Sequence, residues 1–289
     1  EFGGARGGMG MGVMRGWASL GGIGCAGVVR LLLTTEYGWR SVYLVGIVPL
    51  LILAFARRSL KETDAFEKAQ AEPAMGLMEI WSTPYAKRLL LLALIWFVAY
   101  LPAQNAVAFW KEFAIGERGF TDGEVGMAIS IAAVGSMPFV FYSGRLLDVI
   151  GRRRGAAVIF TIGAVGVCCC YMLHGFWALT IALMAGIFAA SAYMPVLNAY
   201  STELFPTKFR GVAYAWANNL IGRLGYVISP FVVGYLVGET QAFGPIVASL
   251  AVFNFVAIGL IYAFLPETKG MTLEESSHIH TTDAPPKTF

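Results

Sequence analysis

An arginine and several amides stand inside apolar stretches of this sequence, where polar groups are costly. Arg223 lies in the segment ANNLIGRLG, about one helical turn after Asn218 and Asn219. A charged side chain at the centre of a membrane helix costs about 2.5–3.5 kcal/mol on insertion scales, so it is a functional candidate by default. Three roles are open for Arg223: it binds an anionic solute, it pairs with a buried acid, or it helps to pack helices by bonding to carbonyls.

Other polar side chains are candidates for the same solute path. The pair Gln104-Asn105 follows Pro102 in an apolar stretch, and amides in such a place suit hydrogen bonding to a polar solute. Arg30, by contrast, lies near the end of its stretch and is expected to extend to the membrane interface. The solute-path candidates are Gln104, Asn105, Trp110, Asn198, Asn218, Asn219 and Arg223.

The sequence offers little for catalysis or metal binding. His174, His278 and His280 form no catalytic or metal-binding pattern, and Cys25 and Cys168–Cys170 lie in apolar stretches, where a thiol behaves as a small hydrophobe. Neither a zinc spacing nor a disulfide framework is present. No Ser-His-Asp order, paired catalytic carboxylate or Gly-rich phosphate loop appears. We expect a protein that is not an enzyme and has no metal or cofactor.

The elements that carry these residues follow from composition. The chain has 289 residues, 57% apolar and only 13% charged, whereas about a quarter of an ordinary soluble chain is charged. Lipid admits only helices or closed barrels, and long apolar runs without alternation favour helices of about 20 residues. We expect an all-α polytopic membrane protein with about eight transmembrane helices, near 17–33, 41–56, 89–110, 125–143, 155–173, 176–199, 211–238 and 243–265.

Lysine and arginine set the expected orientation. Nearly all of them fall in segments on one side of the eight spans, and only Arg40, Lys111 and Arg118 fall on the other. The positive-inside rule then places both termini of this chain in the cytoplasm, in an inner or plasma membrane. The net charge of +3 reports this topology and does not indicate nucleic acid, although Arg152–Arg154 are placed to meet anionic lipid.

Four regions are expected along the chain. The polar segment 57–88, of mixed charge and with Pro73 and Pro84, separates two spans from the following six. It predicts a cytoplasmic linker between a region 1–56 and a six-helix bundle 89–265, with a cytoplasmic tail 266–289.

Three charged segments resemble signatures of one family. They read Gly144-Arg-Leu-Leu-Asp-Val-Ile-Gly-Arg-Arg153, Glu203-Leu-Phe-Pro-Thr-Lys-Phe-Arg-Gly211 and Pro266-Glu-Thr-Lys-Gly270. In this order, and all on the predicted cytoplasmic side, they resemble the major facilitator superfamily, in its branch for sugars and other metabolites. That family has twelve helices in two halves and works by alternating access. The resemblance implies that this chain corresponds to helices five to twelve, and that it is a fragment.

The resemblance also implies roles for the charged residues. Asp148, expected just past a helix end, would be clamped by Arg152 and would face the positive N-terminal end of a helix starting near Arg15; the alternative is a solvated turn acid. Glu203 would join a charge network with Glu267, the alternative being a surface ion pair with Arg210. The expected gate residues are Gly144, Asp148, Gly151, Arg152, Arg153, Glu203, Arg210 and Glu267.

The expected substrate is a small organic anion, because Arg223 is the charged residue that lies deepest within a predicted span. Sugar porters of the family place a Gln-Gln-x-x-Gly-x-Asn pattern where this chain has only Gln104-Asn105, which leaves a sugar or polyol porter as the alternative. No acid lies inside a span, and Glu112 is expected at the interface, so proton coupling rests on the resemblance. A receptor or scaffold that has lost transport is the alternative of another class.

Overall fold

The computed structural model describes residues 9–10, 12–18, 21, 32, 36–58, 76–240, 242–271 and 276. The chain divides into two compact units, one spanning Trp17–Ala74 and the other Phe2–Gly16 with Met75–Phe289, and each is described by itself. Several expectations fall outside the described residues: most of the span 17–33 with Cys25 and Arg30, residues 59–75 of the linker, His278 and His280, and the side chain of Gln104.

Most of the described residues are helical, and seven of their helical stretches are long and apolar enough to cross a membrane. This confirms an all-α polytopic membrane fold. The helices are α2 (Trp39–Arg57), η1 (Glu79–Ser82), α4 (Ala86–Ala108), α5 (Trp110–Gly116), α6 (Asp122–Ile150), α7 (Arg152–Met172), α8 (Phe176–Glu203), α9 (Thr207–Tyr214), η2 (Ala215–Gly222), α10 (Leu224–Thr240), α11 (Phe243–Ser249) and α12 (Val252–Phe264).

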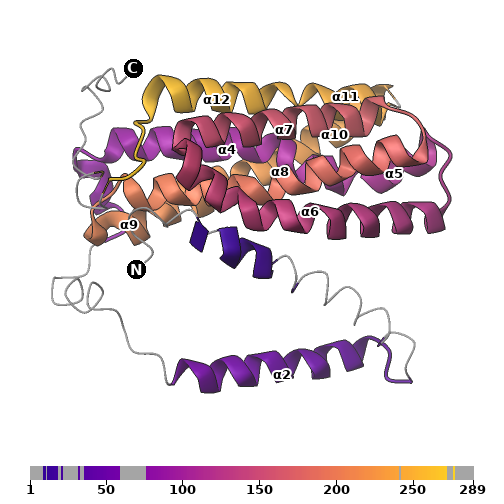
Figure 1. Ribbon diagram of the computed structural model, residues 1–289, viewed down its shortest axis with the longest axis horizontal. Coiled ribbons are helices and arrows are strands. Elements are labelled where there is room, and N and C mark those ends of the chain that lie inside the picture. Colours follow the sequence, from indigo (N-terminus) through magenta and orange to yellow (C-terminus); the bar gives the residue numbers. More distant parts are fainter. Residues whose placement is uncertain are drawn as a thin grey trace. The chain divides into compact units, whose positions relative to one another are not determined.

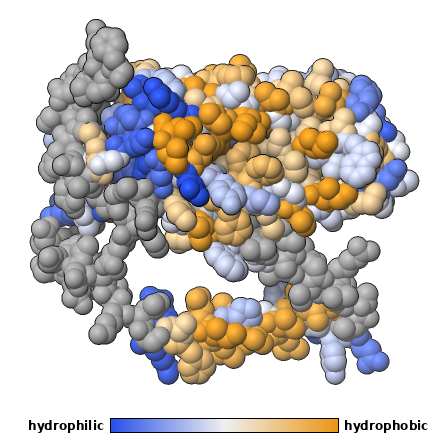
Figure 2. Space-filling model, in the orientation of Figure 1, coloured by the Kyte–Doolittle hydropathy of each residue, from blue (hydrophilic) through white to orange (hydrophobic). Residues whose placement is uncertain are grey.

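Helix α2, in the first unit, runs from Trp39 to Arg57 and so begins two residues before the expected span 41–56. Its apolar side chains are exposed, among them Leu50, Leu53 and Phe55. A helix that is apolar all round is typical of a membrane span or a large core. Figure 2 shows the hydrophobic residues of such surfaces in orange.

The second unit is a bundle in which α8 and α4 are the central helices (Figure 1). Helix α8 packs along both α6 and α7, while α4 packs along η2, α10 and α12. One apolar core cluster includes Trp96, Tyr100 and Tyr200, and a second includes Trp110 and Tyr171. Figure 2 shows hydrophobic residues along the flank of this bundle, as expected of a surface that meets lipid.

Helix α6 runs further than the sequence suggests. It continues through Gly144 and Asp148 to Ile150, so the expectation that Asp148 lies just past the helix end is wrong. The helix stops at Gly151, whose φ of 94° favours glycine, and the N–H of Gly151 still bonds the Leu147 carbonyl. Helix α7 starts at the next residue, so the motif forms a tight corner between two helices, and no long loop separates them.

The opposite end of the bundle is fixed by a second pair of charged residues. The Glu117 carboxylate accepts hydrogen bonds from the N–H groups of Phe243 and Gly244, at the start of α11. The Arg118 guanidinium donates to the carbonyls of Leu173 and Tyr171, at 3.0 and 3.2 Å, where α7 ends. These contacts satisfy helix-end groups that lack partners within their own helices.

Candidate functional site

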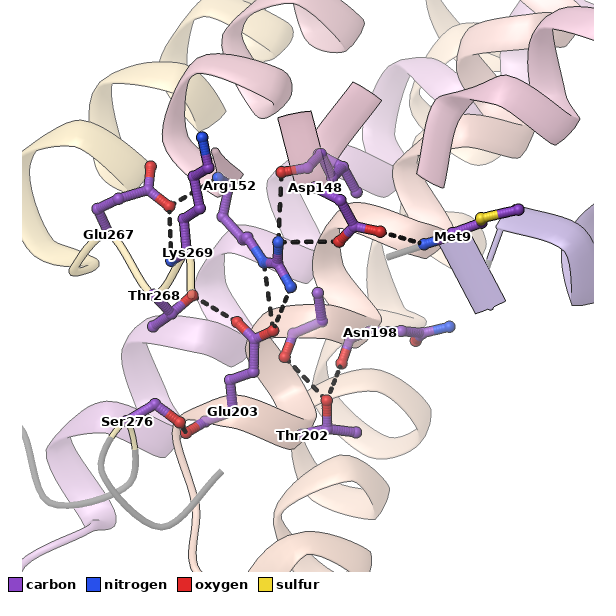
Figure 3. Close-up of polar contacts among 12 residues, drawn as sticks. Met9, Asp148, Arg152, Asn198, Thr202, Glu203, Glu267, Thr268, Lys269 and Ser276 are labelled. Carbon is purple, nitrogen blue, oxygen red and sulfur yellow. Dashed lines mark hydrogen bonds and ion pairs between the residues drawn. The ribbon is translucent and has the colours of Figure 1, made fainter. Parts of the chain in front are cut away.

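A buried cluster of charged side chains lies at the corner between α6 and α7 (Figure 3). The Arg152 guanidinium lies 3.0 Å from Asp148 Oδ1 and 2.9 Å from Glu203 Oε1, and its Nε also donates to Glu203. The side chains of Arg152, Asp148 and Glu203 are 2%, 9% and 11% exposed. One buried cation thus holds carboxylates from two helices, α6 and α8.

The segment after α12 also reaches Glu203. The Thr268 hydroxyl donates to the second carboxylate oxygen of Glu203, and the Ser276 hydroxyl donates to its backbone carbonyl at 2.7 Å. Thr268 and Ser276 are 2% and 1% exposed. Figure 3 shows both side chains directed at the end of α8, so the chain beyond the last span is part of this cluster.

Glu267 caps the start of α7. Its two carboxylate oxygens accept the backbone N–H groups of Arg152 at 2.7 Å and Arg153 at 3.0 Å. An acidic group is favoured there because the first N–H groups of a helix are unpaired and carry partial positive charge. A Cβ at Gly151 would lie 2.7 Å from Glu267 Oε2, so the close approach of the carboxylate needs a glycine at this corner.

Asp148 connects the cluster to the N-terminal helical residues. Its Oδ2 accepts the backbone N–H of Met9 at 2.7 Å, while Oδ1 faces Arg152 (Figure 3). The helical residues are described from Met9 onward, so the expectation that this helix starts near Arg15 is wrong. A Cβ on Gly12 would lie 2.8 Å from the backbone nitrogen of Gly144, so the two helices approach closely beside Asp148.

Arg210 and Arg153 are near this cluster but make other contacts. Arg210 Nε donates to the carbonyls of Thr202 at 2.8 Å and Phe205 at 3.0 Å, bracing the turn between α8 and α9. Glu203 pairs with Arg152, so the alternative of a surface pair between Glu203 and Arg210 is wrong. The Arg153 guanidinium donates to the Tyr262 carbonyl and lies 5.0 Å from the centre of the Tyr262 ring.

A second polar group lies halfway along the span Thr207–Thr240. The residues of η2 form a π-helix, a form that is rare and often marks functional sites. Buried Asn218 in η2 accepts a hydrogen bond from the Tyr100 hydroxyl at 2.6 Å, and the Tyr100 ring stacks on Tyr226 with centroids 4.0 Å apart. Arg223 follows η2 with its side chain exposed.

A cation stands next to this tyrosine pair in the chain. Arg223 directly follows η2, which carries Asn218, and it precedes Tyr226 by three residues. Arg15, among the N-terminal helical residues, adds a second positive charge to the electrostatic surroundings of both hydroxyl groups. This arrangement suits a negatively charged solute.

The other solute-path candidates lie elsewhere in the bundle. Asn105 is buried, donates to Ser229 Oγ at 2.5 Å and joins α4 to α10. Trp110 is fully buried in the second core cluster. Asn198 points away from the Arg152 cluster (Figure 3), and Asn219 is exposed. Of the seven candidates, the structure brings Asn218 and Arg223 to the same tyrosine pair, and the solute-path role of the others stays a prediction.

Some residues of these two groups carry weak signals in the sequence. Tyr100 lies four residues before Gln104, on the same helical face, and Tyr226 lies three residues after Arg223. Thr268 stands inside the Pro266–Gly270 segment, but Ser276 follows in a polar tail without a distinguishing pattern. Helical spacing indicates which residues share a face, but it does not indicate which distant helix that face meets.

Comparison with known families decides the classification. The profile described as Major Facilitator Superfamily matches residues 92–285. The chain belongs to this superfamily. The membership confirms the resemblance of the three charged motifs and places the chain in a superfamily of multi-pass membrane transporters.

Several relatives within the superfamily are named as transporters. The chain is 28% identical to the probable 4-methylmuconolactone transporter of Cupriavidus pinatubonensis, covering 88% of this chain and 60% of the relative. It is 22% identical to the putative niacin/nicotinamide transporter NiaP of Bacillus subtilis, covering 86% and 62%. It is 25% identical to the cis,cis-muconate transport protein of Acinetobacter baylyi, covering 76% and 56%. The chain thus spans about 60% of the length of these relatives.

A solved structure supports the fold. The proton:xylose symporter XylE superposes with a TM-score of 0.73 at 16% sequence identity, covering 94% of this chain and 67% of that structure. At this identity the likeness concerns the arrangement of helices and carries no information about the solute.

Proposed function

We propose that the protein is a secondary active transporter that moves a small organic anion by alternating access. The observation that carries the proposal is the hydrogen-bonded and stacked group of Asn218, Tyr100 and Tyr226, with Arg223 between Asn218 and Tyr226 in the same membrane-spanning stretch. Guanidinium groups match carboxylates in geometry, and phenol hydroxyls add hydrogen-bond donors. The stacked rings would offer a flat apolar face, so the best-fitting solute is a planar unsaturated carboxylate.

The named relatives favour the same class of solute. They are called transporters of 4-methylmuconolactone, niacin/nicotinamide and cis,cis-muconate; niacin and muconate are small unsaturated carboxylates, and nicotinamide is the neutral amide of niacin. No contact in the described residues favours a sugar over such an anion. The organic anion is therefore the first candidate to test, with a sugar as its comparison.

The charged cluster is proposed as the gate at the end of the bundle where α6 meets α7. Asp148 joins Arg152 to the backbone of Met9, and Gly12 and Gly144 let the two helices close against each other. Opening this end requires the Asp148–Met9 contact to break, while Glu203 and Glu267 keep the start of α7 in place. We also propose protons as the coupling ion, on the family resemblance of the three motifs.

Uptake into proteoliposomes tests the proposal. With an inward proton gradient, we expect accumulation of radiolabelled cis,cis-muconate and little uptake of xylose. Arg223→Gln should raise the KM for muconate at least tenfold, since a hydrogen bond to a charged group is worth about 1.5–3 kcal/mol, and Arg223→Lys should recover part of the loss.

The matched control is Lys208→Gln, which removes an exposed cation of α9 outside the tyrosine pair and should leave the KM unchanged. Xylose uptake without muconate uptake would establish the sugar alternative. Absence of flux for every solute would support the receptor or scaffold. Muconate uptake that does not depend on the proton gradient would contradict proton coupling but leave the proposed solute standing.

A further inference from the structure

A groove on the flank of the bundle is independent of both sites described above. It has a volume of about 620 Å³ and lies between α6 and α7, with α8 at its base. This volume is within the range of small-molecule sites, about 300–1,000 Å³. Its lining is mostly apolar, and it includes Phe139, Tyr142, Arg145, Val149, Val158 and Met184.

The apolar walls of the groove are exposed. Phe139 is 56%, Tyr142 64% and Val149 61% exposed on α6, and Val158 on α7 is 40% exposed. Apolar side chains gathered in this way at the surface mark an interaction site or a surface that meets lipid. Since α6 and α7 are long and apolar enough to cross a membrane, acyl chains of the bilayer are the apolar partner that fits this surface.

Each wall ends in an arginine at the corner where α6 meets α7. Arg145 lies six residues before Gly151 and lines the groove. Arg154 lies three residues after Gly151, and it shares a helical face with the groove residue Val158, four positions further along α7. At 1.5 Å per residue, both start within about 9 Å of the corner, and long side chains extend toward the interface.

These two arginines differ from the neighbouring Arg152 and Arg153. Arg152 is bound by Asp148 and Glu203, and Arg153 by the Tyr262 carbonyl. Arg145 and Arg154 are exposed and make no hydrogen bond or ion pair with any residue in the part of the chain that the structure describes. The groove therefore combines an apolar channel with two cations at one end, and its complement is a molecule with an apolar chain and an anionic head.

We propose that this groove binds an anionic phospholipid of the leaflet at the α6–α7 corner. One acyl chain lies between α6 and α7 over Met184, and the phosphate lies between the guanidinium groups of Arg145 and Arg154. The Tyr142 phenol, also on the lining, is placed at the rim as an additional donor. The bound molecule needs both an acyl chain and an anionic headgroup. A neutral lipid would give the two arginines no negative charge to pair with, and a free phosphate would leave the apolar groove empty.

Lipid binding to the purified protein in detergent tests the proposal, by native mass spectrometry and thermal shift. The probes are phosphatidylglycerol, phosphatidylcholine with the same acyl chains, and glycerol phosphate. Each basic residue near an anionic surface contributes on the order of fivefold. We expect phosphatidylglycerol to bind on the order of thirtyfold more tightly than phosphatidylcholine, a preference that falls as salt is raised, and glycerol phosphate not to compete.

Two kinds of variant distinguish binding of the lipid headgroup from binding of the acyl chain. The double variant Arg145→Gln with Arg154→Gln should lose the preference for phosphatidylglycerol, and Val158→Trp should weaken both lipids by filling the groove. The control Lys87→Gln with Lys208→Gln removes the same charge from α4 and α9 and should keep the preference.

Three results would overturn the proposal. They are equal binding of the two lipids to the unmodified protein, full competition by glycerol phosphate, and retention of the preference in the Arg145/Arg154 double variant. A Val158→Trp variant that changes oligomeric state but not lipid binding would assign the groove to a second copy of the chain instead. If the double variant does not fold, the salt dependence of lipid binding and the single variant Arg154→Gln test the role of the arginines. A lipid preference that is unchanged in both measurements would overturn the proposal.

Discussion

At the scale of single residues, Arg152 is the side chain on which the charged cluster depends. It is 2% exposed and faces two carboxylates that are themselves nearly buried. Taking such charges out of water costs several kcal/mol per ion, and this cost is recovered only while every partner is in place. The cluster is therefore better explained by positioning of α6, α7 and α8 than by net stabilisation.

Removing Arg152 should be strongly destabilising. Arg152→Gln leaves Asp148 and Glu203 as buried carboxylates without their cation, and loss of one partner of a buried pair costs about 3–5 kcal/mol. Thermal unfolding of the purified protein measures this loss. Lys87→Gln, which removes an exposed cation at the start of α4, should change the melting temperature little, and an equal effect of the two variants would contradict the buried-pair interpretation.

Asp148→Asn should separate folding from transport. The amide still accepts the Met9 N–H bond but loses the charge that faces Arg152. We expect normal insertion and expression with reduced uptake, because the closed gate is weakened. Uptake equal to that of the unmodified protein, at matched expression, would show that this carboxylate is not part of a gate.

At the scale of elements, helix ends in this bundle are held by carboxylates distant in sequence. Glu267 caps α7 and Glu117 caps α11, each accepting two backbone N–H groups. Neither helix has a capping side chain of its own at the preceding residue. The corner at Gly151 consequently depends on the chain that follows α12.

Glu267→Ala should loosen the start of α7. Loss of an N-cap acceptor typically costs about 0.5–2 kcal/mol, so we expect a lower melting temperature and faster hydrogen exchange at the amides of Arg152 and Arg153. Glu239→Ala, at the exposed end of α10, is the matched control. Unchanged exchange at these two amides would mean that the cap does not hold the corner.

At the scale of the whole molecule, the asymmetry of positive charge predicts which end of the spans faces the cytoplasm. Lys208, near the charged cluster, should lie inside, and Lys111, at the start of the α5 segment, outside. In a background with Cys25 and Cys168–Cys170 replaced by alanine, Lys111→Cys should react with an impermeant maleimide on intact cells. Lys208→Cys should react only after permeabilisation, and the reverse labelling would contradict the predicted orientation.

The sequence by itself determined the class of fold and the three charged motifs. Scarcity of charge and the length of apolar runs are local properties, and lipid admits few structures, so helices and their approximate bounds follow directly. The candidates Asp148, Arg152, Glu203 and Glu267 could be named because they stand in three short motifs that resemble signatures of one family.

Only the tertiary structure decided which residues meet. Tyr100 bonds Asn218 across 118 positions, and Met9 bonds Asp148 across 139. Such contacts follow from how helices pack, and helical periodicity specifies a face without specifying the neighbour that covers it. The stacked pair of Tyr100 and Tyr226, and the groove between α6 and α7, emerge at that level.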